Sequence, residues 1–500
     1  MNPLFIFVRP PRPMWPFNGP SSSFWPPLAF ASMAAMLRQH VPAWRVEILD
    51  APAFEMGWRS LEAELRRRQP AVVALGEEAV SCVECLRLAR LARAVGAQVI
   101  AGGCFFGHVA PHALGTGLVD AVVHGEGENT IVELAQALRE NTPDALAKVA
   151  GISFMRDGVV MRTSPRPLIE NLDSLPMPAW DLLPMHRYGA GSRNHPGLTA
   201  IEASRGCFND CSFCVLWRQM GNFVSGQTRP FMRIKSVERL LEEIRIQTRD
   251  FGRRHFGWVD PCFNAHPRIP SELSEALLRE NMRISQSAWL RADCLVRDAQ
   301  SGSLATMIRG GLNEIFVGVE RPDSEGLKDV HKNTTIPVVR EAFRIMTHDY
   351  PQVFTLGTFI YGLPGDTPAT VRAIFRLSHE LEMDHAFFIP LTPLPGTPFW
   401  RDDMWDDSGA AFRDFSFLPS ATGRYTPRNL EWAFLVAFAT EWSPARVRSY
   451  WRSFRCDNAR KRRIVLRLAA RSAWFAAYGM VRGLLTGQRC GMIFPHWYES

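Results

Sequence analysis

The chain has 500 residues, of which 46% are hydrophobic and 21% charged, and it contains no low-complexity tract and no repeat of fixed period. This composition excludes disordered, collagen-like and solenoid proteins, and the length exceeds one ordinary hydrophobic core, so two or three domains are expected. The net charge of +7 is concentrated near the C-terminus, because residues 444–489 hold twelve Lys or Arg and one acid.

The first apolar run, Leu4–Val8, predicts a strand rather than a secretory signal, because prolines and arginines follow it at once. No stretch reaches about 18 uninterrupted apolar residues, which argues against a membrane-spanning helix. Ten cysteines without a secretory signal fit a reducing cytoplasm, where clustered cysteines hold metal more often than they form disulfides. We therefore expect a cytoplasmic protein, and peripheral contact with the inner membrane face stays open.

Residues 1–140 alternate short apolar strands with helical stretches. The predicted strands are LFIFVRP, RVEILD, AVVALG, QVIAGG and AVVHG. The alternation predicts a doubly wound, flavodoxin-like parallel sheet with a ligand crevice outside the carboxyl ends of its strands. Three glycine-bearing loops follow strands at that edge, at 76–81, 102–108 and 125–129. Their glycines would let backbone amides approach a bulky ligand closely.

Residues 141–197 are predicted to form a linker that contains a hairpin. In GISFMRDGVVM, Asp157 and Gly158 supply a two-residue turn. The stretch 169–184 is interrupted by prolines and is expected to run extended over the surface.

Residues 198–400 show six strand–helix units. The predicted strands are LTAIEASRG, HFGWVDPCF, ISQSAWLRAD, EIFVGVERP, FTLGTFIYGLP and HAFFIPLTPLPGT. Six successive units predict a partial, TIM-like (βα)6 barrel, in which reactive groups lie at the carboxyl ends of the strands.

The first of these strands runs directly into three cysteines, Cys207, Cys211 and Cys214, in a C-x3-C-x2-C array. A structural zinc site needs four ligands, usually from two tight clusters separated by about 12 or more residues, and no second cluster of that kind is present. Three thiolates on one loop instead suit a 4Fe-4S cluster with one iron left open.

With Phe213 directly before the third cysteine, this motif resembles that of the radical S-adenosylmethionine (SAM) superfamily. The segments WVDPCF, LRAD, GVE, GLPGDT and TPLPGTP resemble the family's motifs at the other strand ends. The resemblance implies that the three cysteines bind the cluster and that four residues serve SAM: Phe213, Asp260, Arg291 and Glu320. Pro261 stands where many relatives have a second acid, so Asp260 is the one acid of that motif in this sequence.

The first segment resembles the cobalamin-binding domain that precedes the barrel in one branch of this family. The resemblance rests on PPLAFASMAAMLRQH, VEILDA, IAGGCFFGH and DAVVHGEGENTIVELAQAL. It implies a cobalamin site at Gly76, Glu77, Gly102, Gly103, Cys104, Gly125, Glu126 and Gly127. The D-x-H-x-x-G motif is absent, so cobalt is expected to be held without a protein imidazole, and His108 is a disfavoured candidate axial ligand.

Together the two resemblances imply an enzyme that methylates an unactivated carbon of a small-molecule, lipid or pigment substrate through a 5′-deoxyadenosyl radical and methylcobalamin. An electron donor such as flavodoxin or ferredoxin would reduce the cluster. An oxidative cyclase resembling the anaerobic porphyrin cyclases, or a rearrangement enzyme, is the alternative. A cobalamin sensor without catalysis is a third and less favoured reading.

Other cysteines are better explained by packing. Cys82 and Cys85 have helical spacing and favour a core position over a second cluster shared with Cys104, and Cys262 and Cys294 favour packing over a radical-handling thiol. Residues 401–500 are helical and basic. We expect this segment to cover the barrel mouth, with anionic membrane contact next and nucleic acid contact least favoured.

Overall fold

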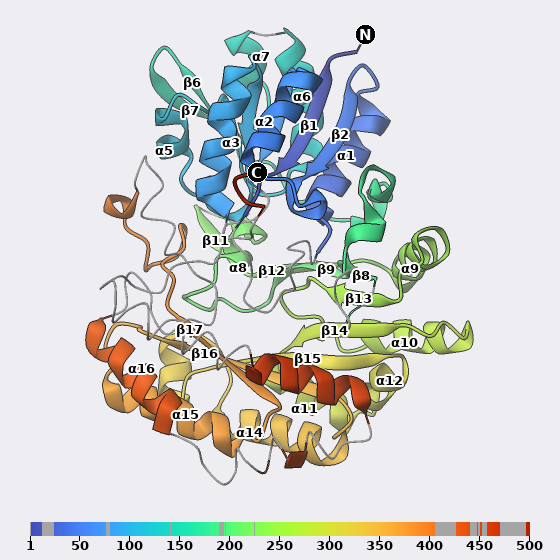
Figure 1. Cartoon of the computed structure of the whole chain (residues 1–500), viewed down its shortest axis with the longest axis vertical. Helices are drawn as coiled ribbons and strands as arrows, with labels where there is room; N and C mark the ends of the chain where they lie inside the picture. Colours follow the sequence, from blue (N-terminus) through green and yellow to red (C-terminus); the bar gives the residue numbers. More distant parts are fainter. Residues whose placement is uncertain are drawn as a thin grey trace.

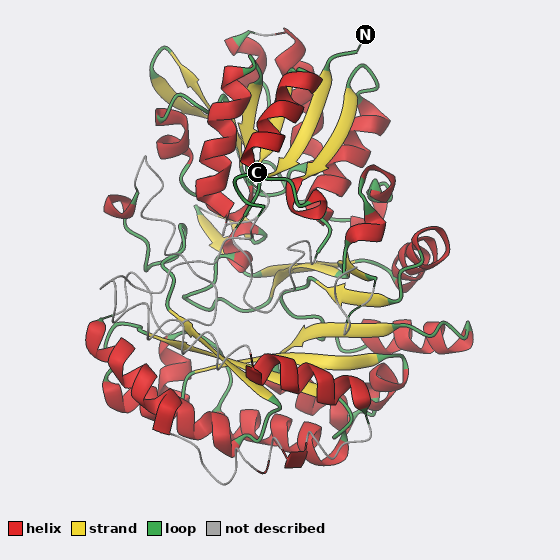
Figure 2. Ribbon diagram, in the orientation of Figure 1, coloured by secondary structure: helices red, strands yellow, loops and turns green. Residues whose placement is uncertain are grey.

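The computed structural model describes residues 2–12, 25–76, 81–140, 142–189, 195, 197–224, 226–405, 427–440, 448, 451–452, 458–470 and 497–500. Two α/β domains follow one another along the chain, and the elements after β8 that carry the cysteine motif lie between the two large sheets (Figures 1 and 2). Glu77 and most of residues 401–500 lie outside the described residues.

The first domain is built on a sheet with strand order β2-β1-β3-β4-β5-β6-β7. The parallel part of this sheet consists of β1 (Leu4–Arg9), β2 (Arg45–Asp50), β3 (Val72–Leu75), β4 (Gln98–Ala101) and β5 (Ala121–Val123). This is the flavodoxin-like order, as the alternating pattern predicts. These strands are apolar on both faces because helices cover both faces of the sheet.

Two helices, α1 (Leu28–His40) and α6 (Glu128–Glu140), pack on one face of this sheet. The other face is covered by α2 (Trp58–Arg68), α3 (Cys82–Ala94), α4 (Gly103–Phe106) and α5 (Ala110–Gly115). Cys82 and Cys85 are buried in the core beneath α3, which confirms the packing interpretation of this pair.

The predicted hairpin forms from β6 (Ile152–Arg156) and β7 (Val159–Arg162). Asp157 and Gly158 both have positive φ, at 51° and 77°, as a tight two-residue turn requires. The hairpin joins the first sheet because β6 pairs antiparallel with β5. The prediction that the following stretch runs extended over the surface is wrong, because it forms short 3-10 turns (Leu172–Ser174, Trp180–Leu182, Met185–Arg187). Apolar side chains of the last two turns pack in the first domain's core.

The second domain is an open barrel of six parallel strands in the order β17-β16-β15-β14-β13-β8. These strands are β8 (Leu198–Ile201), β13 (His255–Trp258), β14 (Ser285–Leu290), β15 (Leu312–Glu320), β16 (Phe354–Tyr361) and β17 (His385–Pro390). The outer face is covered by α9 (Val237–Phe251), α10 (Ile269–Arg279), α11 (Ala292–Gln300), α12 (Ser303–Arg309), α13 (Ser324–Asp329), α14 (Ile336–Arg344) and α15 (Pro368–Glu380). The predicted six-strand parallel arrangement is confirmed.

Small elements after β8 carry the cysteine motif. The strand β9 (Ser204–Cys207) pairs antiparallel with β12 (Phe231–Ile234), and β10 (Asn222–Val224) pairs with β11 (Gln227–Arg229). The helix α8 (Leu216–Gln219) follows the third cysteine.

The described C-terminal pieces pack on both domains. The helix α16 (Arg428–Thr440) packs on the barrel's outer helix α15. The helix at 459–470 places Ile464 and Val465 against Phe354 and Leu356 of β16. Residues 497–500 contact the first domain, where the backbone N–H of Trp58 donates to the carbonyl of Tyr498 at 3.1 Å. Among the described helices, none has the length and apolarity needed to cross a membrane.

Candidate active site

The three motif cysteines lie on one loop beyond the carboxyl end of β8. Cys207 ends β9, and its neighbour Gly206 has φ +88°, where a Cβ would overlap the carbonyl oxygen of Phe231. Glycine therefore permits the close pairing of β9 with β12 that holds Cys207 in place.

The thiols of this loop influence one another electrostatically. Burial, together with the proximity of Cys211 and Cys207, raises the pKa of Cys214 to about 12. The side-chain amide of Asn209 donates to the Sγ of Cys211 at 3.3 Å, and the indole of Trp217 donates to the Cys211 carbonyl at 3.0 Å. Burial also raises the pKa of Cys207. Thiols whose ionisation is disfavoured when nothing neutralises them fit a positively charged iron cluster.

Asp260 supports the cysteine loop from below. Its carboxylate accepts hydrogen bonds from the backbone N–H groups of Ala203 and Ser204 and from the Ser204 hydroxyl. Burial raises the pKa of Asp260 to about 6. The sequence places this residue in a SAM pocket, whereas these contacts direct its carboxylate to the chain entering the cysteine loop.

Glu320 ends β15 with φ 67° and forms an ion pair with Lys332, whose Nζ lies 3.0 Å from its Oε1. Burial lowers the pKa of Lys332, but the neighbouring Glu320 outweighs it and leaves the pKa above its usual value. Gly318 makes this pair possible, since a Cβ there would overlap Glu320 and stand 2.6 Å from the Lys332 Nζ.

Arg291 follows β14 and bridges two parts of the site. Its guanidinium pairs with Asp293 and donates to the carbonyls of Lys332 and Asn333, and it lies 5.0 Å from the ring centre of Phe208. It therefore links the cysteine loop to the loop that carries Lys332. Phe213 is half-buried between the second and third cysteines.

The glycine-bearing loops of the first domain gather at the carboxyl ends of β3, β4 and β5. Gly76 has φ +102°, and a Cβ there would stand 2.5 Å from the carbonyl oxygen of Gly102, so these two loops touch. Gly103 and Gly125 also have positive φ. A Cβ at Gly127 would stand 2.6 Å from the Met33 Sδ.

A buried ionic group joins these loops to the cysteine loop. Arg205, two residues before Cys207, pairs with Glu202 at 2.9 Å and with two acids of the first domain, Glu126 at 3.0 Å and Glu128 at 2.6 Å. Arg233 of β12 also pairs with Glu126, at 2.7 Å. Burial raises the pKa of Glu126, but Arg205 and Arg233 outweigh it and leave the pKa below its usual value. We call these five residues the interdomain ionic group.

A cavity of about 510 Å³ lies between the two domains. Gly103, Cys104 and residues 125–128 line one side, and the inner face of the barrel, including Ser287 and Trp289, lines the other. Burial raises the pKa of Cys104 to about 11, so this thiol is protonated in the cavity wall at neutral pH. The loops with room for a bulky ligand thus face the barrel interior.

Two family comparisons agree with this geometry. Residues 201–378 match the family described as the Radical SAM superfamily, and residues 16–135 match the B12 binding domain. The chain is a cobalamin-binding radical SAM enzyme. It uses a 4Fe-4S cluster, SAM and cobalamin, as the sequence motifs imply.

Relatives of this enzyme are named for different activities. An uncharacterised methyltransferase of Pyrococcus horikoshii is 29% identical over 390 residues, which are 75% of this chain and 78% of the relative. The hopanoid C-3 methylase of Methylococcus capsulatus is 30% identical over 295 residues, or 58% of this chain and 51% of the relative. The anaerobic magnesium-protoporphyrin IX monomethyl ester cyclase of Synechocystis is 31% identical over 242 residues, or 48% and 45%. The chain thus spans about half the length of the last two.

The architecture is shared with a solved radical SAM methyltransferase, TsrM of Kitasatospora setae. The TM-score is 0.60 at 18% sequence identity, and the likeness covers 79% of this chain and 74% of TsrM. At this identity the comparison supports the fold of the radical SAM enzyme and its order of domains.

Several residues of the site were not predicted from the sequence of this radical SAM enzyme. Arg205 and Lys332 are the principal ones. Two acidic partners of Arg205 belong to the first domain, and Lys332 reaches Glu320 from a loop 12 residues further along the chain. The one local indication of a role for Arg205 is its position two residues before the first cysteine of the motif. Cys262 and Cys294 are both buried, and they lie close enough for a hydrogen bond from Cys262 to lower the pKa of Cys294.

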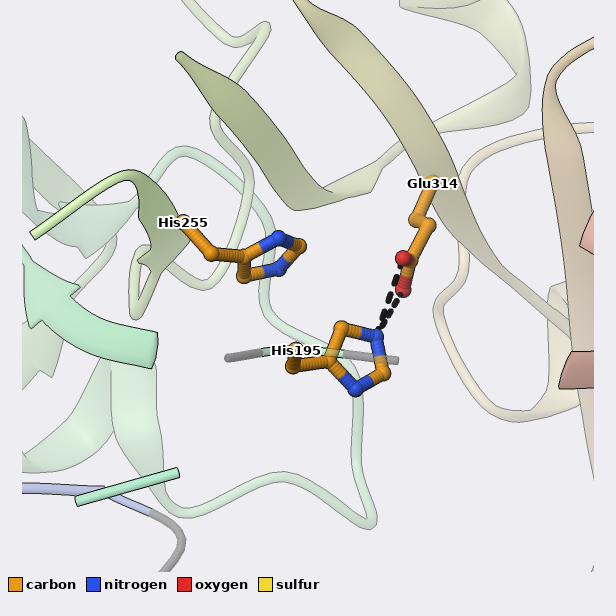
Figure 3. A group of neighbouring side chains, drawn as sticks. All are labelled: His195, His255 and Glu314. Carbon is orange, nitrogen blue, oxygen red and sulfur yellow. Dashed lines mark hydrogen bonds and ion pairs between the residues drawn. The ribbon is translucent and has the colours of Figure 1, made fainter. Parts of the chain in front are cut away.

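A second group of metal-ligand residue types lies at the amino ends of the barrel strands, away from the cysteine loop. His195, His255 and Glu314 point toward one another (Figure 3), and their ligand atoms lie within 4.8 Å of each other. Arg460 donates to the His255 Nδ1 at 2.6 Å and to the Glu314 carboxylate at 2.7 Å. The guanidinium of Arg460 thus occupies the place that a metal ion would take among these residues. Its contacts with His255 and Glu314 anchor the helix at 459–470.

The prediction that residues 401–500 cover the barrel mouth is wrong for this helix. Arg460 contacts the first residues of β13 and β14, His255 and Ser285, and Lys461 pairs with Asp384 just before β17. Those are the amino ends of the strands, opposite the mouth. The basic stretch 471–489 lies outside the described residues.

Proposed function

We propose that this enzyme transfers a methyl group from SAM to an unactivated carbon of a small-molecule substrate of the lipid or pigment type. The observation that carries the proposal is the cavity between the domains, which the glycine-bearing loops bound on one side and the barrel interior on the other. The match to a methylase over 58% of the chain supports the reaction type.

Different residues of the chain would bind the three cofactors. Cys207, Cys211 and Cys214 would hold the cluster, and Phe213, Arg291 and the Glu320–Lys332 pair would bind SAM, with Asp260 acting through the loop that it holds. Gly76, Gly102, Gly103, Gly125 and Gly127 would admit cobalamin, with Glu77, Cys104 and Glu126 beside it. When bound, these groups supply a carbon-centred radical and a transferable methyl group. The walls of both domains would limit the access of water to the reacting atoms.

Two accessory contacts belong to the same proposal. A one-electron donor such as flavodoxin or ferredoxin would reduce the cluster. The basic segment 444–489 would contact an anionic membrane surface from which a lipid substrate is taken.

Methyl-labelled SAM tests the reaction. Anaerobically reconstituted enzyme would be incubated with reductant, labelled SAM and an extract from a strain that lacks the gene, and products would be followed by mass spectrometry. We expect one apolar product that gains the label and one 5′-deoxyadenosine for each product. A new product without the label would refute methyl transfer.

An oxidative cyclase is the second candidate, and the match to the Synechocystis cyclase favours it. In that case the same incubation yields a product that has lost hydrogen and gained no labelled carbon. The two candidates therefore differ in one mass measurement.

A further inference from the structure

Residues 497–500, which we call the latch, lie across the first turns of α2 and α3 (Figure 1). The backbone N–H of Trp58 donates to the carbonyl of Tyr498 at 3.1 Å. The N–H of Ser60 donates to the backbone oxygen of Ser500 at 3.2 Å. Because the first N–H groups of a helix have no partner within the helix, the latch supplies acceptors that the first turn of α2 needs.

Gly57 leaves the space in which the latch lies. Its φ of −86° and ψ of −173° are extended values that any residue adopts, so the backbone itself does not require glycine. A Cβ at this position would stand 2.1 Å from the carbonyl oxygen of Trp497 and 2.6 Å from the backbone nitrogen of Ser500. The latch therefore explains why position 57 has no side chain.

Two side chains of the latch make specific polar contacts with α3. The Tyr498 hydroxyl donates to the Glu84 carboxylate at 3.1 Å, and Glu84 is only 4% exposed. The Glu499 carboxylate accepts two hydrogen bonds from the Arg87 guanidinium, at 2.9 and 3.0 Å. Since this ion pair is exposed, it contributes orientation more than binding energy, and the buried contact with Glu84 contributes more.

Aromatic packing supplies the remaining contacts of the latch. Trp497 is buried, and the ring of Tyr498 meets that of Trp58 edge-on, with the ring centres 6.1 Å apart. The Arg87 guanidinium lies 4.3 Å from the centre of the same Trp58 ring. These contacts favour one bound arrangement over loose contact with the surface. The residues that receive the latch, which we call its seat, are Gly57, Trp58, Glu84 and Arg87.

The seat lies at the edge of the first domain that carries the glycine-bearing loops. The helices α2 and α3 follow the parallel strands β2 and β3, so both helices begin at the carboxyl edge of the sheet. Glu84 belongs to the first turn of α3, which begins shortly after Gly76. The latch therefore joins the starts of two helices beside a loop to which the sequence assigns cobalamin.

The chain reaches this seat from the barrel. The helix at 459–470 lies at the amino ends of the barrel strands, where Arg460 contacts His255 and Ser285. The latch, by contrast, is bound to the first domain. The chain after the barrel thus contacts both domains and adds a second connection between them.

We infer that the latch is an intramolecular ligand that retains cobalamin in the first domain by fixing the starts of α2 and α3. Tyr498 and Glu499 are positioning residues, because they act through Glu84 and Arg87 rather than by contact with the cofactor. Release of the latch from its seat accelerates the loss of cobalamin. The inference goes beyond the proposed function, since it holds for methyl transfer and for cyclisation alike.

The rate of cobalamin release from the holoenzyme tests this role. Enzyme loaded with cluster and radiolabelled cobalamin is diluted into excess unlabelled cobalamin, and the label that stays with the protein is followed. Tyr498→Phe should release cobalamin about three- to tenfold faster, as expected for one lost hydrogen bond to a buried carboxylate. Gly57→Ala should also accelerate release, because its Cβ displaces the latch.

Gly115→Ala is the matched control, since a Cβ there meets nothing within 4 Å. Iron content should be equal in all variants, which shows that the loss of cobalamin does not come from unfolding of the barrel. Release from both latch variants at the rate of the control overturns the inference.

A peptide added in trans tests the seat without any cofactor. The peptide has the sequence of residues 491–500 and a fluorescent label, and its binding is measured by anisotropy. It should bind full-length Tyr498→Ala, whose own latch is weakened, at least about tenfold more tightly than the unchanged enzyme, whose seat is occupied. Adding Gly57→Ala to that variant should abolish binding. Equal binding to all three proteins refutes the inference.

These measurements are separate from the test of the proposed reaction. If the latch variants lose cobalamin faster while labelled methyl groups reach no product, the proposed function fails and the role of the latch stands. If methyl groups are transferred while cobalamin release does not respond to the latch, the inference fails and methyl transfer stands.

Discussion

Gly318 decides whether two charged side chains can meet over the inner face of β15. The strand register shifts between Gly318 and Glu320, and the Glu320 carboxylate turns back over Gly318. The missing Cβ is the space in which the Glu320 carboxylate and the Lys332 ammonium pair. The glycine of the GVE motif therefore provides the space for the ion pair, and its glutamate provides the carboxylate.

Gly318→Ala should weaken SAM binding about tenfold, because the new methyl group drives the Glu320–Lys332 pair out of position. Equilibrium binding of SAM to the anaerobic, cluster-loaded enzyme measures this. Gly115→Ala is the matched control, since a Cβ there meets nothing within 4 Å. An unchanged SAM affinity in Gly318→Ala would show that the pair does not serve SAM.

Stability should decrease as the pH is lowered from 7.5 to 5.5, because the buried histidines outweigh the opposite effect of Asp260, whose pKa burial raises to about 6. Burial lowers the pKa of His255 from 6.5 to about 3. In this window the unfolded chain takes up a proton at His255 that the folded chain does not, at a cost of up to about 1.4 kcal/mol per pH unit. Glu314 adds no slope here, because its pKa is lowered from 4.5 to about 2 and it is ionised in both states.

Thermal unfolding across this pH range checks the contribution of His255. His255→Gln should be less stable at pH 7.5 but should show a shallower dependence on pH. The histidines at 108 and 124 titrate in the same direction, since burial lowers the pKa of each to about 4, so some slope remains. Identical slopes in the two proteins would mean that His255 titrates as an exposed histidine does.

At the scale of elements, the parallel strands were predictable and the small antiparallel ones were not. The six barrel strands are apolar runs that end at glycine, proline or acid, which is a strong local signal. By contrast, β10 has three exposed residues, Asn222–Val224, and no apolar alternation. Its pairing with β11 depends on the chain around the cysteine loop rather than on its own composition.

The helix at 459–470 should stabilise the barrel through Arg460. Arg460→Met leaves the buried carboxylate of Glu314 and the imidazole of His255 without their guanidinium, which should destabilise the barrel by about 3 kcal/mol. A lower thermal midpoint would report the loss. Arg463→Met, at an exposed position of the same helix, is the control. Equal midpoints for both variants would show that the contact contributes nothing.

At the scale of the whole molecule, the contacts between the two domains could not be predicted from the sequence. The three cysteines are recognisable because their spacing is local. Arg205 is not, because Glu126 and Glu128, its partners in the first domain, lie 79 and 77 residues away in the sequence. A charged residue beside a motif has many possible partners, and the fold selects among them.

Arg205→Gln should separate cobalamin retention from cluster retention. The change leaves acids of both domains buried without their shared guanidinium, so the first domain should lose its fixed position against the cysteine loop. We expect at least about tenfold weaker cobalamin retention on gel filtration and an unchanged iron content. Arg245→Gln, which breaks an exposed ion pair with Glu280, is the control. Cobalamin retention equal to that of the control would contradict this role.

Trp25 lies directly on Gly257 of β13, where a Cβ would overlap its indole ring, and this contact has a consequence for how such enzymes diversify. Part of the wall of the cavity between the domains, including Trp25, comes from the segment that precedes the barrel. A chimera that takes its barrel from one relative and its first domain from another would inherit a mixed cavity wall. Substrate selectivity should therefore depend on the combination of the two domains. Substitutions near the start of the chain should change selectivity in directed evolution as often as substitutions in the barrel.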